Sequence, residues 1–134
     1  MSLEIRQREQ EGILVLDLEG RITVGEEAGK LRETLRELAG AGHLNVVLNL
    51  QGVDYIDSTG LGTLVICFTT LSKAGGKLAL LNLSRRNIEL LVYTKLATVF
   101  EIFTDEQEAV NSYFPDRAIK RFDILDFVQQ EGKD

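Results

Sequence analysis

The first part of the chain carries two short runs in which apolar and polar residues largely alternate. These runs cover Leu3 to Glu9 and Ile13 to Gly20, and a period of two is the pattern of a half-buried β-strand. The residues between them, Gln10, Glu11 and Gly12, are typical of a tight connection. We therefore predict a β-hairpin whose two strands are antiparallel.

The next segment changes to helical spacing. After a break at Val24 and Gly25, apolar residues recur every three or four positions, and glycines stand at positions 40 and 42. Glutamates occupy the expected first turn, where the helix dipole favours negative charge. The pattern predicts an amphipathic helix over residues 26–42, with an apolar face formed by Leu31, Leu35 and Leu38.

A nearly unbroken apolar run, Leu44 to Leu50, precedes a second segment of helical period. A strand covered on both faces has this composition, so we place the run at the centre of the sheet. The helix is expected to begin at Ser58 and to end at Gly75 and Gly76, which supply a left-handed stop. We expect Leu64 and Phe68 to be buried among its apolar positions, which are Leu61, Leu64, Val65, Phe68 and Leu71.

The alternation of strands and helices continues to residue 114. We predict strands at Lys77 to Leu83 and at Val99 to Phe103, a helix capped by Ser84, and a helix opened by Asp105 before Pro115. A hairpin followed by such an alternation implies a mixed, mostly parallel sheet. The predicted fold class is therefore α/β, with about four α-helices around that sheet.

Residues 117–134 are interpreted as a C-terminal extension of one domain that spans residues 1–116. A chain of 134 residues is the right length for one compact core. The extension carries the apolar residues Phe122, Ile124, Leu125, Phe127 and Val128. They could form a short helix docked on the body of the domain, or on a second copy of the chain, which would make a homodimer.

Charge and composition narrow the class of partner. The formal charge of −6 results from 21 acidic and 15 basic residues, so nucleic acid would bind against an unfavourable overall field. No apolar run approaches the roughly 20 residues of a membrane span, and residues 1–12 lack the charged-then-apolar order that is typical of a secretory signal. Cys67, the single cysteine, cannot form an internal disulfide and is expected to be buried in its apolar helix. We expect a cytoplasmic protein that binds a protein or a small molecule, with no nucleic acid and no membrane insertion.

The motifs of common enzymes are incomplete in this chain. The segment 25–31, GEEAGKL, is one residue short of a phosphate-binding loop and ends in leucine where that loop has a hydroxyl group. Ser58 lacks the glycine that a nucleophile elbow has two residues earlier, since Ile56 stands there. His43, the single histidine, lies in a helix-to-strand connection where a solvated side chain is expected. We therefore predict no enzyme activity, no metal and no cofactor.

The stretch VDYIDSTGLGTLV, Val53 to Val65, places acids and hydroxyls where the central strand passes into the second helix. Ser58 and its neighbours could simply cap that helix, because Ser, Thr and Asp are good N-caps. The end of a strand joined to a helix N-terminus is also where open α/β folds place their chemistry. A hydroxyl there lies at the positive end of the helix dipole, and the same surroundings can receive a phosphate.

The neighbours of Ser58 belong to the predicted site as well. Asp57 and Asp54 could hydrogen-bond the hydroxyl or contact a partner, although both are also turn-forming acids. Gly60 and Gly62 leave the first turn without bulk, at a cost of about 1 kcal/mol each relative to alanine. That cost suggests that another protein's backbone comes close to this turn.

The residues VVLNLQGVDYIDSTGLGTLV, Val46 to Val65, resemble the signature of the STAS domains, and in particular of the free-standing anti-sigma-factor antagonists. The most specific part is Asp57 to Gly62, which matches a D-S-[ST]-G-L-G element after the central strand. The likeness covers roughly residues 3 to 114 and leaves out the tail. It implies the STAS fold, and it implies that Ser58 is phosphorylated by a serine kinase that is itself the anti-sigma factor.

The resemblance further implies a protein-binding switch that catalyses nothing itself. Unphosphorylated, such a protein captures the anti-sigma factor and frees the sigma factor; phosphorylated, it lets go, and a phosphatase could reverse the modification. Nucleotide and magnesium would belong to the kinase. The residues implied in partner binding are Thr23, Asp54, Asp57, Ser58, Thr59, Gly60, Leu61 and Gly62.

One position departs from the pattern of that family. Many phosphorylated antagonists carry an acid in the turn after the second strand, where this chain has Thr23. The missing acid leaves open a second hypothesis, a STAS scaffold or a subunit of another assembly, such as a lipid-transport complex, without a phospho-switch. A third hypothesis, an enzyme with Ser58 as nucleophile, requires a nearby base that the sequence does not provide.

Overall fold

The structure is a computed structural model that describes residues 3–119 and residue 127. Strands and helices alternate after an initial hairpin, which confirms the predicted order. The elements are β1 (Leu3–Gln10), β2 (Ile13–Ile22), α1 (Glu26–Gly40), β3 (Asn45–Ile56), α2 (Ser58–Lys73), β4 (Lys77–Leu81), α3 (Arg85–Tyr93), β5 (Glu101–Phe103) and α4 (Glu106–Asn111).

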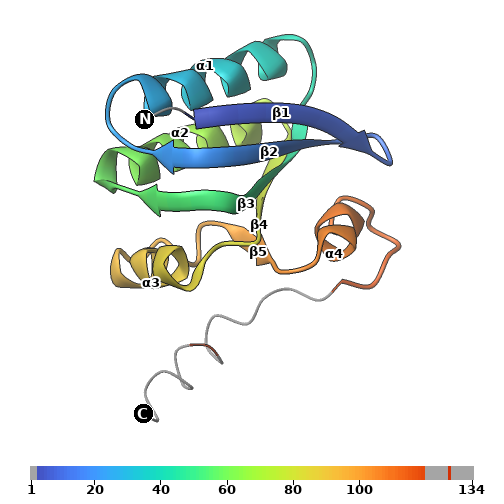
Figure 1. Cartoon of the computed structure of the whole chain (residues 1–134). Helices are drawn as coiled ribbons and strands as arrows, with labels where there is room; N and C mark the ends of the chain where they lie inside the picture. The colour runs from blue at the N-terminus through green and yellow to red at the C-terminus, as the bar shows by residue number, and fades with distance from the viewer. Residues whose placement is uncertain (1–2, 120–126, 128–134) are drawn as a thin grey trace.

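The strands form one five-stranded sheet in the order β1-β2-β3-β4-β5 (Figure 1). β1 pairs with β2 antiparallel, and every other neighbouring pair is parallel. The hairpin turn has φ of 54° at Glu11 and 85° at Gly12, and positive φ at both positions suits the right-handed twist of the flanking strands. The predicted mixed, mostly parallel α/β fold is confirmed.

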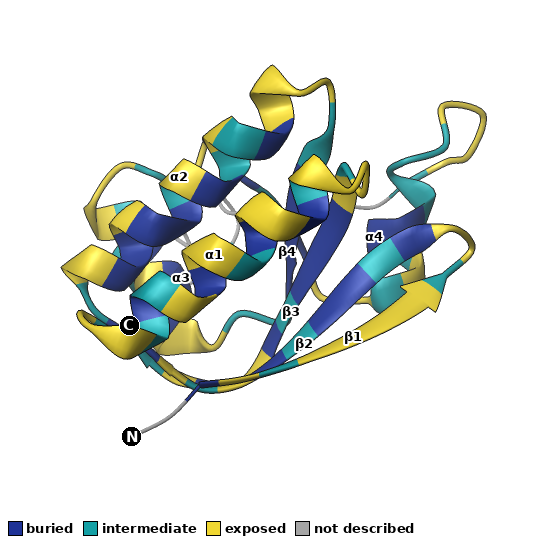
Figure 2. Cartoon of the chain, turned by 90° about the horizontal axis from the view of Figure 1, so that it is seen from above, coloured by how far each residue is buried: buried dark blue, intermediate teal, exposed yellow. Residues whose placement is uncertain are grey.

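Helices cover both faces of the sheet. On one face α1 and α2 pack over leucines of β2, β3 and β4, and α3 reaches the same core with Leu91. In Figure 2 the exposed sides of α1 and α2 are turned away from the strands. On the opposite face Ala109 and Val110 of α4 pack against Val15, Val47 and their neighbours. α1, α2 and α3 therefore share one hydrophobic core, and α4 packs on a smaller core across the sheet.

β3 is longer than its apolar run predicts. It continues past Leu50 to Ile56, because β2 is long enough to stay paired with it up to Ile22 and Ile56. Glycine and aspartate are poor strand formers, so pairing with β2 and not local propensity sets this end. As a result the candidate segment follows the central strand directly. β4 and β5 are shorter than predicted, ending at Leu81 and beginning at Glu101.

Two helices begin at the predicted caps. The Ser84 hydroxyl accepts a hydrogen bond from the Asn87 backbone N–H at 3.2 Å, and the Asp105 carboxylate accepts one from the Glu108 N–H at 3.1 Å. Each bond satisfies a first-turn amide that has no partner within the helix. α1, by contrast, follows Gly25, which has φ of 104° and makes no side-chain cap.

Burial along α2 differs from the prediction at one residue. Leu64 and Cys67 have no exposed surface, and burial raises the pKa of the Cys67 thiol to about 12. Phe68, which was expected to be buried, is only half-buried and meets Phe100 edge to face at a centroid distance of 5.6 Å. Leu64, Cys67 and Leu71 lie at the middle of the buried face of α2. Phe68, which follows Cys67, therefore lies at the border of that face.

The remaining predictions concern a loop and the tail. His43 is exposed in the connection between α1 and β3, as predicted. The predicted tail helix falls mostly outside the described residues, which end at residue 119 apart from residue 127.

Candidate functional site

The carboxyl ends of β2 and β3 meet at one edge of the sheet. Ile22 pairs with Ile56 in the parallel register, so Thr23 and Asp57, the residues after them, leave the sheet side by side. The Asp57 backbone N–H donates to the Ile22 carbonyl at 3.3 Å. The β2–α1 connection and the start of α2 therefore form one surface, at the strand ends where α/β folds place their sites.

Asp57 holds this surface together through both oxygens of its side chain. Oδ1 accepts a hydrogen bond from the Gly60 N–H at 2.7 Å, which makes Asp57 the N-cap of α2. Oδ2 accepts a second one from the Val24 N–H at 2.9 Å. The hypothesis that Ser58 is the cap is therefore wrong, because the preceding aspartate takes that role and leaves Ser58 as the first residue of the helix.

Ser58 and Thr59 are both exposed in the first turn of α2. No described residue makes a hydrogen bond to the Ser58 hydroxyl that would restrain it. First-turn amides have no intrahelical partner, and the positive end of the helix dipole lies here. Ser58 thus presents a free hydroxyl next to groups that favour negative charge.

The two glycines of this turn have different surroundings. A β-carbon on Gly60 would lie 1.8 Å from the Ile22 carbonyl oxygen, whereas one on Gly62 would meet nothing within 4 Å. Gly60 is buried and Gly62 is exposed. The expectation that Gly60 leaves room for a partner's backbone is therefore corrected, since the chain's own β2 occupies that space. Only Gly62 is open to an approaching protein.

The three other predicted residues occupy different positions. Leu61 is 4% exposed and packs in the main core, so it supports the turn from below. Asp54 is exposed on β3, and no described contact connects it with Ser58. Thr23 is half-buried, and its carbonyl accepts a hydrogen bond from the Ala28 N–H at 3.0 Å at the start of α1.

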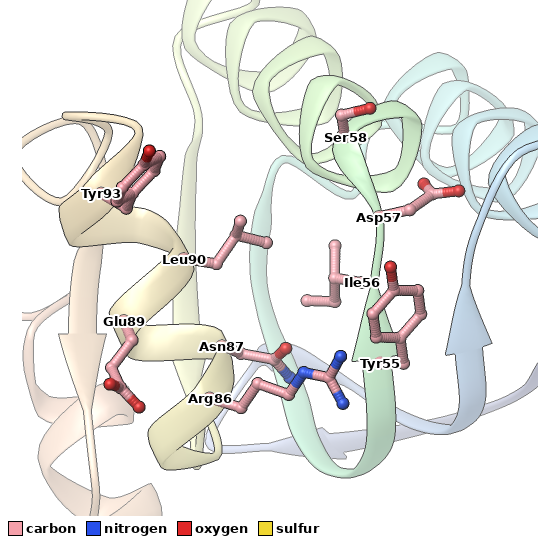
Figure 3. Close-up of a pocket in the computed structure, with 9 residues that line it drawn as sticks. All are labelled: Tyr55, Ile56, Asp57, Ser58, Arg86, Asn87, Glu89, Leu90 and Tyr93. Atoms are coloured by element: carbon pink, nitrogen blue, oxygen red, sulfur yellow. The ribbon is translucent and has the colours of Figure 1, made fainter.

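A cleft of about 390 Å³ opens beside Ser58, between α3 and the end of β3 (Figure 3). The Arg86 guanidinium lies over the Tyr55 ring, 4.6 Å from its centroid. This is a cation–π contact, in which the face of the ring attracts the positive charge of the guanidinium. The lining residues are Tyr55, Ile56, Asp57, Ser58, Arg86, Asn87, Glu89, Leu90 and Tyr93. Tyr93 is 87% exposed.

The α3 side of this cleft is absent from the sequence-based site. One signal was available, because Arg85 and Arg86 are adjacent cations at the start of a helix in an acidic chain. The sequence did not indicate which strand end α3 faces, since that depends on how the helix packs on the sheet. Asn87 gave no signal at all.

Neither a histidine nor a metal-binding cluster is found at this site among the described residues. No His or Cys is among the residues that line the cleft beside Ser58. Among residues 3–119 and residue 127, no three His, Cys, Asp or Glu side chains could together hold a metal ion. Within the same residues, no helix is both long and apolar enough to cross a membrane.

Comparisons with known proteins agree with this architecture. The anti-sigma-B factor antagonist of Bacillus subtilis (strain 168) is 36% identical over 110 residues, which cover 82% of this chain and 99% of that protein. The anti-sigma-B factor antagonist of Listeria monocytogenes is 32% identical over 108 residues, covering 81% of this chain and 93% of the relative.

Solved structures show the same fold. The crystal structure of a Thermotoga maritima protein assigned as an anti-sigma factor antagonist superposes with a TM-score of 0.75 at 23% identity. It covers 81% of this chain and 92% of the Thermotoga chain. The model of the STAS domain matches residues 4–109, which contain the hairpin, the whole sheet and the Ser58 turn. The chain therefore belongs to the STAS domain family.

Proposed function

We propose that this STAS protein is an anti-sigma-factor antagonist that captures an anti-sigma factor through the surface around Ser58. Relatives at 36% and 32% identity carry that name. The observation that carries the proposal is the exposure of Ser58 at the start of α2, on a turn held by Asp57. Buried Gly60 and Leu61 position the turn. The residues that contact the partner are the exposed and half-buried members of the predicted site, which are Thr23, Asp54, Asp57, Ser58, Thr59 and Gly62.

The surface around the serine is suited to a protein partner. Val24, in the β2–α1 connection, is 67% exposed, and Ile66, further along α2, is 44% exposed. Between Ser58 and Ser72, α2 carries no charged side chain. A protein that docks on the first turn can therefore bury apolar surface without having to desolvate a charge on this helix.

Phosphorylation of Ser58 would switch this binding. A phosphate adds about −1.5 to −2 charges, and the helix dipole offsets part of the cost at an exposed site, typically by 0.3 to 1 kcal/mol. A docked interface is less tolerant, because a buried unpaired charge costs several kcal/mol. The fold should therefore survive a modification that removes the partner.

The kinase in this proposal is the anti-sigma factor itself, a serine kinase that supplies its own nucleotide and magnesium, and a phosphatase reverses the modification. The antagonist catalyses no reaction and acts in the cytoplasm. Its STAS domain comprises residues 1–116, and residues 117–134 are an extension that partner binding does not require.

Affinity capture from the native cell extract tests the proposal. We expect wild type and Ser58→Ala to retain a histidine-kinase-like ATPase, and Ser58→Asp to lose it while its melting temperature stays within a few degrees. Gln7→Glu is the control, because it adds the same charge at an exposed residue of β1, outside the α2 surface. Retention of the ATPase by Ser58→Asp would contradict the switch.

Labelling with the captured ATPase and ATP gives an independent test. We expect phosphate on Ser58 and none on Thr59, because Thr59 is one residue further into the helix, and successive side chains of an α-helix project about 100° apart. Labelling confined to Thr59 would contradict the assignment of Ser58.

A STAS scaffold without a phospho-switch is the second candidate, and Thr23 in place of the family's acid is the observation that favours it. A scaffold would co-purify with subunits of another assembly, and Ser58→Asp would not change its binding to them. The same capture experiment separates the two functions.

A further inference from the structure

The cleft beside Ser58 carries hydrogen-bond donors that the proposed switch does not use. We infer that it receives an acidic side chain, Asp or Glu, of the protein that docks at Ser58. The inference rests on the proposed function for the identity of that protein. The carboxylate would lie between α3 and the end of β3, held by Arg86 and Asn87 (Figure 3).

The side-chain amide of Asn87 lacks an acceptor. Asn87 is only 2% exposed, and its Nδ2 is buried without a hydrogen-bond partner among the described residues. Leaving a buried donor unpaired is costly, and native proteins rarely do so without a reason. The side chain extends from α3 toward β3 in Figure 3, so an oxygen entering the cleft gives this amide the acceptor that it lacks.

Arg86 supplies the charge. Its guanidinium lies over the Tyr55 ring, and no described carboxylate pairs with it. A guanidinium presents a planar set of donors that matches the two oxygens of a carboxylate. Arg86 is therefore placed at the cleft by Tyr55 and keeps its hydrogen-bond donors available for an acid.

The other charged groups of the cleft limit the ligand to a single negative charge. Asp57 uses both oxygens on backbone N–H groups, and in Figure 3 its carboxylate and that of Glu89 point away from the space between α3 and β3. They still contribute negative field. The single positive charge of Arg86, set against the two negative charges of Asp57 and Glu89, can balance a ligand carboxylate better than it can balance a phosphate, which carries more negative charge.

The centre of the cleft suits the carbon stem of an amino acid. Ile56 and Leu90 lie between Ser58 and Arg86 and present apolar surface there. An acidic side chain can therefore cover these two residues with methylene groups while its carboxylate reaches Arg86. Because Ser58 lines the same cleft, a phosphate on the serine would also repel that carboxylate.

Acetate is a suitable probe because it carries the proposed group without requiring the partner. We would titrate uniformly ¹⁵N-labelled protein with sodium acetate, sodium phosphate and sodium chloride at equal ionic strength, and follow the side-chain amide resonances of Asn87. We expect a saturable shift with acetate only. Arg86→Gln should raise the apparent Kd roughly tenfold, equivalent to about 1.4 kcal/mol. Arg36→Gln, which removes the same charge from exposed α1, should leave it unchanged.

A second variant keeps the test independent of folding. Asn87→Leu replaces the unpaired donor with an apolar side chain, so its melting temperature should equal or exceed that of wild type. The response of the Arg86 side-chain N–H to acetate should weaken. A clear loss of stability would show that the Asn87 amide has a structural partner, and would overturn the inference.

The other outcomes are equally decisive. An equal response to chloride would show only charge screening, and a response confined to phosphate would show a phosphate-binding site; either result overturns the proposed acidic subsite. The titration needs neither partner nor phosphorylation. Failure of the acetate response with a working Ser58 switch would therefore refute the cleft alone, and the reverse result would refute the switch alone.

Discussion

The carboxylate of Asp57 accepts a hydrogen bond from the backbone N–H of Val24, a residue 33 positions earlier in the chain, with 2.9 Å between Oδ2 and N. The other oxygen of the same carboxylate caps α2 at Gly60. One side chain thus links the connection after β2 to the helix after β3. This link sets the position of the surface on which Ser58 is exposed.

Replacing Asp57 should destabilise the fold locally. Asp57→Ala removes the cap of α2 and the bond to Val24, and we expect a loss of about 1–2 kcal/mol in the free energy of unfolding. Urea denaturation would measure it. Asp54→Ala is the matched control, because Asp54 is exposed on β3 and its loss should stay within about 0.5 kcal/mol. Equal effects of both substitutions would contradict the bridging role of Asp57.

The glycines of the first turn should respond in opposite directions. Gly60→Ala brings its β-carbon against the Ile22 carbonyl oxygen, so we expect a severe loss of stability, about 3 kcal/mol or more, because backbone must shift. Gly62→Ala points into open space and should gain up to about 1 kcal/mol through helix propensity. Thermal and urea unfolding would measure both variants. A neutral Gly60→Ala would show that β2 does not restrict the turn.

Two apolar residues of α2 should differ in their contribution to the core. Leu64 has no exposed surface, so Leu64→Ala should cost about 2–5 kcal/mol. Phe68 is half-buried and retains its edge-to-face contact with Phe100, so Phe68→Ala should cost less than the ~3–5 kcal/mol of a fully buried phenylalanine. Chemical denaturation of both variants would rank them. A larger cost for Phe68 would contradict the orientation of the helix.

Arg8 should make stability depend on pH. Its guanidinium hydrogen-bonds Asp17 at 2.6 Å and Glu106 at 2.8 Å, and these bonds hold the pKa of each carboxyl below its ordinary value of 3.8 or 4.5. A depressed pKa in the folded state stabilises the protein above the ordinary pKa, and this contribution is lost as pH falls through the folded value. We expect Arg8→Gln to cost ~1 kcal/mol at pH 7.

The difference between wild type and Arg8→Gln should shrink as pH falls below 4.5. Urea denaturation at several pH values would show it. Arg36→Gln is the control, because within the described part of the chain Arg36 pairs with Glu33 on α1, where both side chains are largely exposed, so its difference from wild type should stay small at every pH. A pH-independent effect of Arg8→Gln would show that its contacts with Asp17 and Glu106 do not persist in solution.

The order of strands and helices, the hairpin and the fold class could all be predicted from the pattern of apolar and polar residues. Periodicity carries this information, because side chains alternate between the two faces of a strand, whereas on a helix every third or fourth side chain lies on the same face. Caps such as Ser84 and Asp105 are equally local, since their bonds reach only three residues ahead. The Ser58 turn could be found in the same way, from a contiguous motif.

Tertiary structure decided what each residue of that motif does. Asp57 caps α2 through a local bond to Gly60, but its second bond, to Val24, depends on β2 lying beside β3. Gly60 is required by the Ile22 carbonyl, which no spacing along the chain reveals. The length of β3 follows from its pairing with β2. The cleft with Arg86 and Asn87 arises only where α3 packs against the sheet, because contacts between segments distant in sequence leave no periodic trace in either of them.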